Sequence, residues 1–173
     1  MSRNSTTLPV LFFFLILFLL GGCGGGEDRK PPTAALQQPA PTFSLVDDKG
    51  RTWNLEELRG KVVFLNFWAT WCPPCREEMP SMVKLNAILA DKPFVMLTVL
   101  VNDDVRKAEN FLADLQGSLP ILADTDGRVG AMYGLTGVPE TFIIDKEGIL
   151  QKKYIGAFPW DSDGALEMLK LYL

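Results

Sequence analysis

Two cysteines separated by two prolines constrain this chain more than any other feature. Cys72 and Cys75 follow an apolar run from Val62 to Trp68, which is typical of a buried strand, and they precede a helical pattern of apolar residues. A strand, then C-x-x-C, then a helix places the first thiol at a helix N-terminus, where free N–H groups and the helix dipole stabilise a thiolate. The spacing therefore predicts redox chemistry at this pair.

Two other uses of the cysteine pair are weaker. A structural disulfide this short would constrain the unfolded chain by only about 2 kcal/mol. A zinc site would need two further ligands, yet the chain has no histidine and only one other cysteine, Cys23. The absence of histidine also excludes Ser-His-Asp and Cys-His catalysis. We therefore expect no metal, and no cofactor besides the redox-active cysteine pair itself.

The first residues predict export. Arg3 precedes an apolar core of 13 residues from Leu8 to Leu20, and the sequence LGGC then ends at Cys23. Such a core is shorter than the roughly 20 residues that cross a membrane, but it is typical of a signal peptide. LGGC resembles the bacterial lipoprotein box, in which the cysteine is acylated. We expect residues 1–22 to be a lipoprotein signal peptide and Cys23 to carry lipid; an uncleaved anchor is the alternative.

The next segment is expected to connect the lipid to a globular domain. Residues 23–41 are predicted to be the lipidated N-terminus and a flexible tether, because they are rich in Gly, Pro, Ala and Gln without periodicity. Residues 42–173 are predicted to be the domain. The location would be the bacterial cell envelope, with the domain facing the periplasm or another extracytoplasmic space that is oxidising. A net charge of -4 argues against nucleic acid as a partner.

A second motif makes a family resemblance specific. WATWCPPC, followed by Pro80 and later by GVPETF at residues 137–142, resembles the thioredoxin-fold thiol-disulfide oxidoreductases. It is most similar to their TlpA-like, membrane-tethered branch, which includes ResA and CcmG, and the resemblance runs from about Phe43 to the C-terminus. It implies an α/β thioredoxin fold, with a mixed central sheet and helices on both faces. The apolar runs add an N-terminal β-hairpin and a central α-β insertion.

The hydrophobic periodicity and the turn residues give an expected element order. The elements are a hairpin over 43–54, a helical turn over 55–58, a strand over 61–68, a helix over 73–90, a strand over 94–101, a helix from 102–104 to 116, a strand over 119–123, a helix over 126–133, a hairpin over 141–154, and a helix that starts at 161 or 162.

Glu78 is the expected proton carrier of the site. Asn66 stands six residues before Cys72, where thioredoxin-like proteins carry a buried aspartate, so another group must accept the proton of Cys75. Glu78 lies one helical turn after Cys75, in a C-x-x-C-x-x-E arrangement that resembles the one in ResA and CcmG. A desolvated carboxylate there can have a raised pKa and transfer a proton. The alternative is an ordinary acid near the start of a helix.

The substrate is expected to contact residues on both sides of the disulfide, Trp71 and Pro73 on one and Val138, Pro139 and Glu140 on the other. The resemblance implies a cis Val138–Pro139 bond that faces the disulfide. A proline cannot donate a backbone hydrogen bond, so the backbone of Val138 would stay open to a substrate chain; a simple turn proline is the alternative. Glu140 would either orient a cysteine-bearing peptide or be solvated.

The resemblance implies an exported thiol-disulfide oxidoreductase, of the protein-disulfide reductase type. Cys72 would attack a substrate disulfide and Cys75 would resolve the mixed disulfide. Because two prolines remove two N–H groups near Cys72, we expect a comparatively reducing couple. The implied partners are a cysteine-containing protein such as apocytochrome c, before haem attachment, and a membrane thiol-electron carrier of the CcdA/DsbD type. A general periplasmic disulfide reductase or oxidant, and a non-catalytic dithiol binding module, remain as alternatives.

Overall fold

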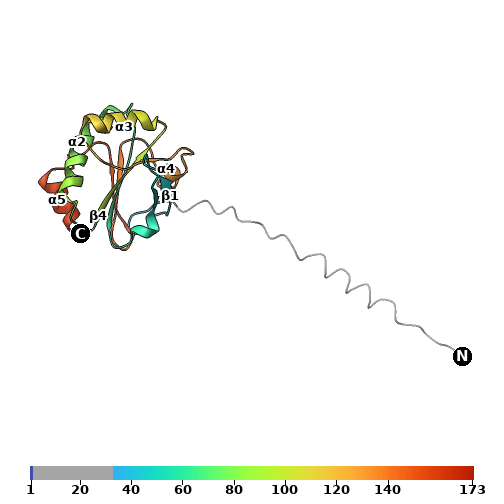
Figure 1. Ribbon diagram of the computed structural model, residues 1–173. Helices are drawn as coiled ribbons and strands as arrows, with labels where there is room; N and C mark the ends of the chain where they lie inside the picture. Colours follow the sequence, from blue (N-terminus) through green and yellow to red (C-terminus); the bar gives the residue numbers. More distant parts are fainter. Residues whose placement is uncertain (2–32) are drawn as a thin grey trace. The chain divides into compact units, whose positions relative to one another are not determined.

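The structure is a computed structural model that describes Met1 and residues 33–173 (Figure 1). The expected signal peptide, the expected lipid site at Cys23 and the first part of the expected tether lie outside the described residues. In the part of the chain that is described, no helix is long and apolar enough to cross a membrane.

A five-stranded mixed sheet, with the order β5-β4-β3-β6-β7, forms the centre of the domain. The strands are β3 (Val62–Trp68), β4 (Phe94–Leu100), β5 (Ile121–Ala123), β6 (Glu140–Ile144) and β7 (Leu150–Ile155). The central strand β3 pairs in parallel with β4 and antiparallel with β6. β5 extends the sheet in parallel beside β4, and β7 closes the other side antiparallel to β6. All of β3 is buried, as its continuous apolar sequence predicts.

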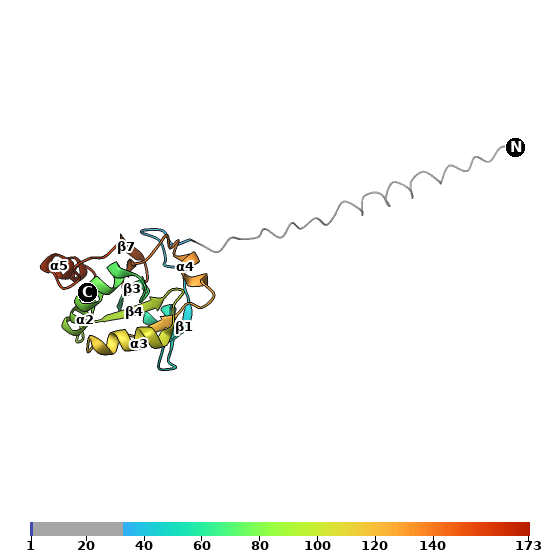
Figure 2. The same cartoon turned by 90° about the horizontal axis from the view of Figure 1, so that it is seen from above.

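Helices cover both faces of this sheet, as expected. The remaining elements are the hairpin strands β1 (Ser44–Val46) and β2 (Thr52–Asn54), the short helix η1 (Leu55–Leu58), and the helices α2 (Pro73–Ile88), α3 (Val105–Asp114), α4 (Arg128–Met132) and α5 (Asp163–Lys170). α2 and α5 lie side by side on one face, and β1 and α4 lie on the other (Figure 1, Figure 2). α3 and β5 form the insertion between β4 and α4. The α/β fold expected from the sequence is therefore confirmed, with ends that differ by a few residues.

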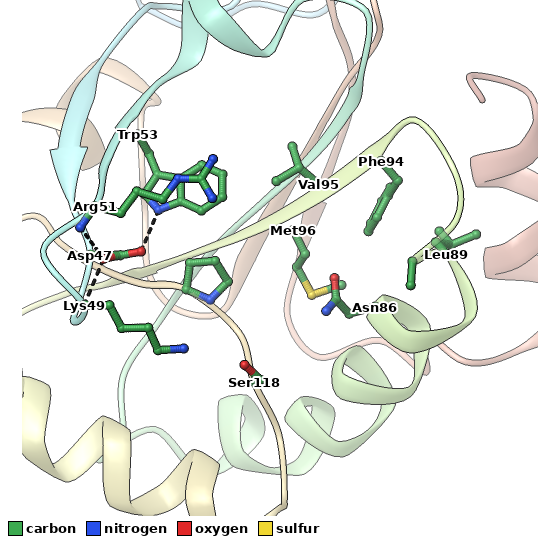
Figure 3. Close-up of a pocket in the computed structure, with 12 residues that line it drawn as sticks. Asp47, Lys49, Arg51, Trp53, Asn86, Leu89, Phe94, Val95, Met96 and Ser118 are labelled. Atoms are coloured by element: carbon green, nitrogen blue, oxygen red, sulfur yellow. Dashed lines mark hydrogen bonds between the residues drawn. The ribbon is translucent and has the colours of Figure 1, made fainter.

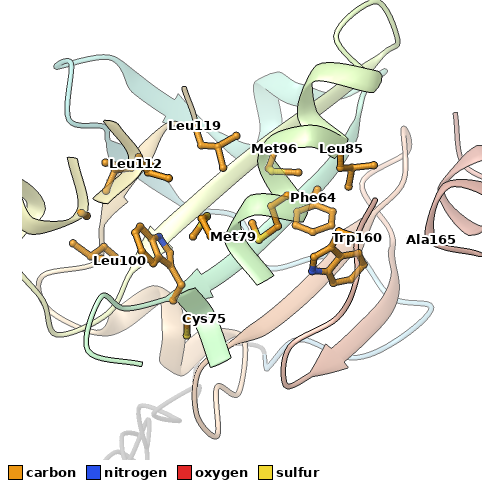
Figure 4. Packing of buried hydrophobic residues seen from close by; sticks show 14 of the residues in the cluster. Phe64, Cys75, Met79, Leu85, Met96, Leu100, Leu112, Leu119, Trp160 and Ala165 are labelled. Carbon is orange, nitrogen blue, oxygen red and sulfur yellow. The ribbon is translucent and has the colours of Figure 1, made fainter. Parts of the chain in front are cut away.

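Alternating side chains of the strands enter two separate cores. Phe64 of β3 belongs to the core beneath α2, α3 and α5, which also contains Cys75 and Trp160 (Figure 4). Its neighbour Leu65 belongs to the second core, beneath the hairpin and α4. Because successive side chains of a strand point to opposite faces, one continuous apolar run supplies both cores.

The chain joins the domain earlier than its composition predicted. Residues 34–41, expected to be tether, lie against the domain: the amide of Ala34 donates to the carbonyl of Met132 at 2.8 Å, and that of Ala40 to the carbonyl of Gly148 at 3.0 Å. Ala40 is only 4% exposed. Composition did not reveal this contact because it uses mainly backbone groups, which every residue type except proline supplies in full. The domain therefore begins before residue 42.

A chain that begins at residue 42 should be less stable than one that begins at residue 33. It loses these backbone bonds, and the buried hydroxyl of Tyr133 loses its acceptor, the carbonyl of Pro41, at 2.9 Å. At roughly 1 kcal/mol for each bond, the free energy of unfolding in urea should fall by about 2 to 4 kcal/mol. A chain that begins at residue 24 serves as the control, and its stability should equal that of the chain that begins at residue 33. Equal stability of the chains from residues 33 and 42 would contradict the packing role.

Candidate active site

Cys72 and Cys75 form a disulfide at the start of α2. Cys72 is the N-cap, and Pro73 and Pro74 fill the first two helical positions, where neither has an N–H group. The first amide that the helix offers is therefore that of Cys75, which donates to Sγ of Cys72 at an N···S distance of 3.2 Å. A Ser or Thr cap makes the same bond with its oxygen. In the reduced protein this single amide would stabilise a thiolate on Cys72.

Exposed apolar side chains surround the disulfide. Trp71 is 59% exposed, whereas Cys72 is 4% and Cys75 is 0% exposed. The Trp71 indole donates to the carbonyl of Asn102 at 3.2 Å, which fixes its ring, and Pro73 is exposed beside it. Of the two sulfurs, that of Cys72 is thus the more accessible to a substrate.

Asp103 holds the loop that leads into Cys72. The amide and the hydroxyl of Thr70 both donate to Oδ2 of Asp103, each at 2.6 Å. Burial alone would raise the pKa of Asp103, but these bonds and the charge of Lys107 lower it below its ordinary value. The sequence places Asp103 only within the range 102–104 where the next helix is expected to begin, and Asp104 is the N-cap of that helix. Nothing in the local sequence marks the contact, because it joins residues 33 positions apart.

The Val138–Pro139 bond is cis, as the resemblance implied. The carbonyl oxygen of Val138 lies 3.5 Å from Sγ of Cys72, so this loop does face the disulfide. Val138 is half-buried and Pro139 is buried. In the described part of the chain, the amide of Val138 has no hydrogen-bond partner. An extended peptide can therefore pair with the backbone at this position.

Glu140 is not at the surface, so neither of its two expected roles fits. It is 0% exposed, and its Oε2 lies 2.8 Å from Nζ of Lys153. Its Oε1 accepts from the amide of Thr136 at 3.0 Å and also from the Thr136 hydroxyl. Burial raises the pKa of Glu140, but the bonds from Lys153 and Thr136 outweigh it and the net shift is downward. Glu140 therefore fixes the loop that carries Val138 and Pro139 through its hydrogen bonds with Thr136 on the buried side of that loop.

Lys153 was missed, although the sequence contains a signal for it. In the structure Glu140 faces Ile155 across β6 and β7, one pair beyond the expected hairpin, which makes Lys153 its diagonal neighbour. Side chains at such diagonal positions reach one another when they are long. An acid and a base at these positions, in a hairpin with a buried inner face, indicate an ion pair.

Glu78 is buried among neutral hydrogen-bond donors. It is 3% exposed, and its Oε1 accepts from Nδ2 of Asn66 at 3.0 Å. Its Oε2 accepts from the amide of Phe158 at 3.2 Å and from the indole Nε1 of Trp160 at 3.0 Å. Burial raises the pKa of Glu78, and these three bonds only partly offset it. This is the environment expected of a proton carrier, and an ordinary surface acid on a helix would not have it.

A small hollow lies beside Glu78. It has a volume of about 250 Å³, and it is lined by Glu77, Glu78, Ser81, Ala157, Phe158 and Pro159. The hollow thus brings open space next to a residue that is itself almost fully covered.

A second groove does not belong to this site. It has a volume of about 420 Å³ and lies between the hairpin, the end of α2 and the start of β4 (Figure 3). The disulfide lies at the start of α2 and beyond the end of β3, which is the opposite end of both layers. Neither cysteine lines the groove, so we assign it no part in the redox chemistry.

Replacing Lys153 by Met should destabilise the domain, because it leaves the charge of Glu140 buried without a partner. Breaking a buried pair costs about 3 to 5 kcal/mol, and we expect the low end because the Lys153 side chain is 25% exposed. Urea unfolding at pH 7 measures the decrease in the free energy of unfolding. The stabilisation that comes from the lowered pKa of Glu140 is present above its unfolded pKa and is lost as the pH falls through the folded pKa. The deficit should therefore shrink as the pH falls below the ordinary value of 4.5. Lys153→Met/Glu140→Gln is the control and should recover part of the loss; an unchanged stability at pH 7 would rule out the pair's role.

The comparisons with known proteins agree with this geometry. The family model Redoxin matches residues 35–169. The chain is 40% identical over 122 residues to the thiol-disulfide oxidoreductase ResA of Geobacillus thermodenitrificans, which covers 70% of this chain and 70% of that protein. It is 36% identical over 127 residues to the thiol:disulfide interchange protein DsbE of Pseudomonas aeruginosa, which covers 72% of this chain and 68% of that protein.

A solved structure supports the same assignment. The crystal structure of a thiol:disulfide interchange protein DsbE from Chlorobium tepidum superposes with a TM-score of 0.73 at 29% identity, and covers 81% of this chain and 99% of that one. Because the family model spans most of the chain, and because relatives at this identity are named as thiol-disulfide oxidoreductases, the chain belongs to the Redoxin family and is a thiol-disulfide oxidoreductase of thioredoxin fold.

Proposed function

We propose that this oxidoreductase is an exported, membrane-anchored reductant of protein disulfides, with apocytochrome c as its substrate. The observation that carries the proposal is the disulfide at the N-terminus of α2, which faces the open backbone of Val138. A single amide bonds the sulfur of Cys72. Fewer donors stabilise the thiolate less, which favours the disulfide form and therefore a reducing couple.

The reaction begins with the reduced cysteine pair, which would be the only redox group. The thiolate of Cys72 attacks one sulfur of the substrate disulfide, and the other substrate sulfur leaves as a thiolate and takes a proton. Cys75 gives its proton to the carboxylate of Glu78, and its thiolate attacks Sγ of Cys72. The mixed disulfide breaks, and the second substrate thiolate leaves and is protonated from Glu78. The cysteine pair loses two electrons to the substrate. Of the two protons that the substrate gains, one comes from Cys75 through Glu78 and the other from water, to which Cys72 released its own proton on ionising.

The exposed groups around Cys72 would bind the substrate. Trp71 and Pro73 offer apolar surface on one side of the sulfur, and the backbone of Val138 offers hydrogen bonds on the other. Pro139 supplies the turn that presents this backbone. Glu140 would act only indirectly, because it is buried beneath the loop. An extended peptide that carries a cysteine fits this combination of a pairing edge and apolar flanks.

The N-terminal sequence supports the proposed compartment. Export through the residues before LGGC, with lipid on Cys23, would hold the domain at the outer side of a bacterial membrane. In an oxidising space a reductant must be re-reduced, and a membrane thiol-electron carrier of the CcdA/DsbD type would supply the electrons.

The reduction potential of the Cys72/Cys75 pair in the domain over residues 33–173 should lie near or below about -220 mV, measured against a glutathione series. The reduced domain should also reduce the disulfide of a C-x-x-C-H peptide, which represents the haem-attachment site of apocytochrome c. Cys72→Ser is the control and should not react. A potential near about -120 mV would identify an oxidant and overturn the proposal. Reduction of other disulfides but not of this peptide would favour a general reductase.

Anchoring through Cys23 predicts that the full chain, produced in a bacterial host, incorporates labelled palmitate and sediments with membranes. Cys23→Ser should lose both properties, whereas Cys72→Ser should keep them. If Cys23→Ser remains in the membrane and the native chain carries no label, the uncleaved anchor is the correct interpretation.

A further inference from the structure

We propose that Trp160 is a positioning residue for proton transfer: with the amide of Phe158 it occupies Oε2 of Glu78 and leaves Oε1 as the oxygen that takes the proton. This inference rests on the proposed role of Glu78. A carboxylate oxygen has two lone-pair directions. Oε2 accepts two bonds, from Phe158 and from Trp160, while Oε1 accepts one, from Asn66. The oxygen with a free direction is therefore Oε1.

The indole of Trp160 cannot turn away from the carboxylate. The side chain is 0% exposed, and its ring meets Phe64, Tyr154 and Phe158 at centroid distances of 4.7, 5.2 and 4.9 Å. Its backbone is also fixed to α2, because the amide of Trp160 donates to Oγ of Ser81 at 3.1 Å. Figure 4 shows the ring against Phe64 in the core that also contains Cys75. The donor is thus held in place before any proton moves.

Neutral donors suit a group that must both gain and lose a proton. Glu140, which is paired with the cation Lys153, has a lowered pKa and stays ionised. The carboxylate of Glu78 has no cation bonded to it in the described part of the chain, and it keeps a raised pKa. The neutral hydrogen bond from Trp160 stabilises the ionised form of Glu78 by less than a bond from a positively charged group would. Both protonation states of Glu78 can therefore take part in the reaction.

The other titratable groups around Glu78 are few. On α2 they are Cys75, one turn before it, and Glu77, which lines the same hollow. On β7 the phenol of Tyr154, with a pKa raised by burial, is neutral at pH 7. Beyond Trp160, Asp161 is paired with Lys84 at 3.1 Å. β3 contributes only the neutral amide of Asn66.

The direct test is a titration of Glu78 in the oxidised protein, where the cysteines do not titrate. The δ-carboxyl ¹³C resonance of Glu78 reports its protonation, and in Trp160→Phe its midpoint should move to higher pH because the ionised form loses a donor. Trp53→Phe is a matched control: it removes an indole bond of 2.8 Å to a different carboxylate, that of Asp47 in the hairpin. The Glu78 midpoint should not change in this control. An unchanged midpoint in Trp160→Phe overturns the inference.

A second measurement needs no variant and so does not depend on the folding of Trp160→Phe. The indole N–H resonance of Trp160 in the native protein should shift with pH along the same curve as the Glu78 carboxyl, since the two groups share a hydrogen bond. If the chemical shift of the indole N–H stays constant while Glu78 titrates, the inference is overturned independently of the variant.

Kinetics separate this inference from the role of Glu78 itself. At pH 7, Trp160→Phe should slow the resolution of a mixed disulfide by about tenfold, part of the 10²–10⁴-fold that a positioned proton carrier contributes, and should shift the pH profile upward. In a Glu78→Gln background, Trp160→Phe should cause no further shift of the profile. If Glu78→Gln leaves rate and profile unchanged, the proposed proton carrier is wrong. If Glu78→Gln changes them and Trp160→Phe does not, only the positioning role is wrong.

Discussion

The active site depends on the burial of β3. This strand is covered on both faces and paired along both edges, so its last residue cannot shift relative to the neighbouring strands. The chain then reaches Cys72 at the start of α2 within four residues. The loops that border the site come from the strands on either side: Asp103 follows β4, and Val138 precedes β6. One buried strand therefore sets the position of the disulfide, of the exposed Trp71 and of the loop that we propose as the substrate contact.

Two glutamates lie buried near this disulfide, and their partners give them opposite behaviour. Glu140 faces a lysine and keeps its charge, so it can hold a loop but cannot exchange a proton near neutral pH. Glu78 faces an amide side chain, a backbone amide and an indole, which carry no net charge. The segment that supplies two of these donors also reaches the substrate loop, since the amide of Gly156 donates to the carbonyl of Pro139 at 2.9 Å. The proposed proton carrier and the proposed substrate loop are thus both bonded to this segment.

The sequence predicted the features that depend on hydrophobic periodicity and on motifs. It did not predict the hydrogen bonds and ion pairs between residues that are distant in the chain. The order of the elements along the chain, the start of α2 and the cis bond before Pro139 follow from the hydrophobic periodicity, the position of the cysteine pair and the family motif. The hydrogen bonds from Trp160 to Glu78 and from Thr70 to Asp103 join residues 82 and 33 positions apart, and no local pattern encodes them. Glu140 was misjudged because its charge suggested exposure, while its partner lies on the next strand. Residues 34–41 were misjudged because backbone pairing leaves no trace in composition.

The absence of histidine gives this site an unusually simple pH dependence. Histidine is the side chain whose ordinary pKa lies between 5 and 8, and this chain has none. Burial tends to raise the pKa of Asp47, Asp103 and Glu140, but their hydrogen bonds outweigh it and move these groups away from that range. Glu78 moves towards it, because burial outweighs its three neutral donors. Its raised pKa means that its contribution to stability is complete below the unfolded pKa and is lost as the pH rises through the folded pKa. Burial therefore disfavours the ionised form of Glu78, which suits the base that we propose for the proton of Cys75.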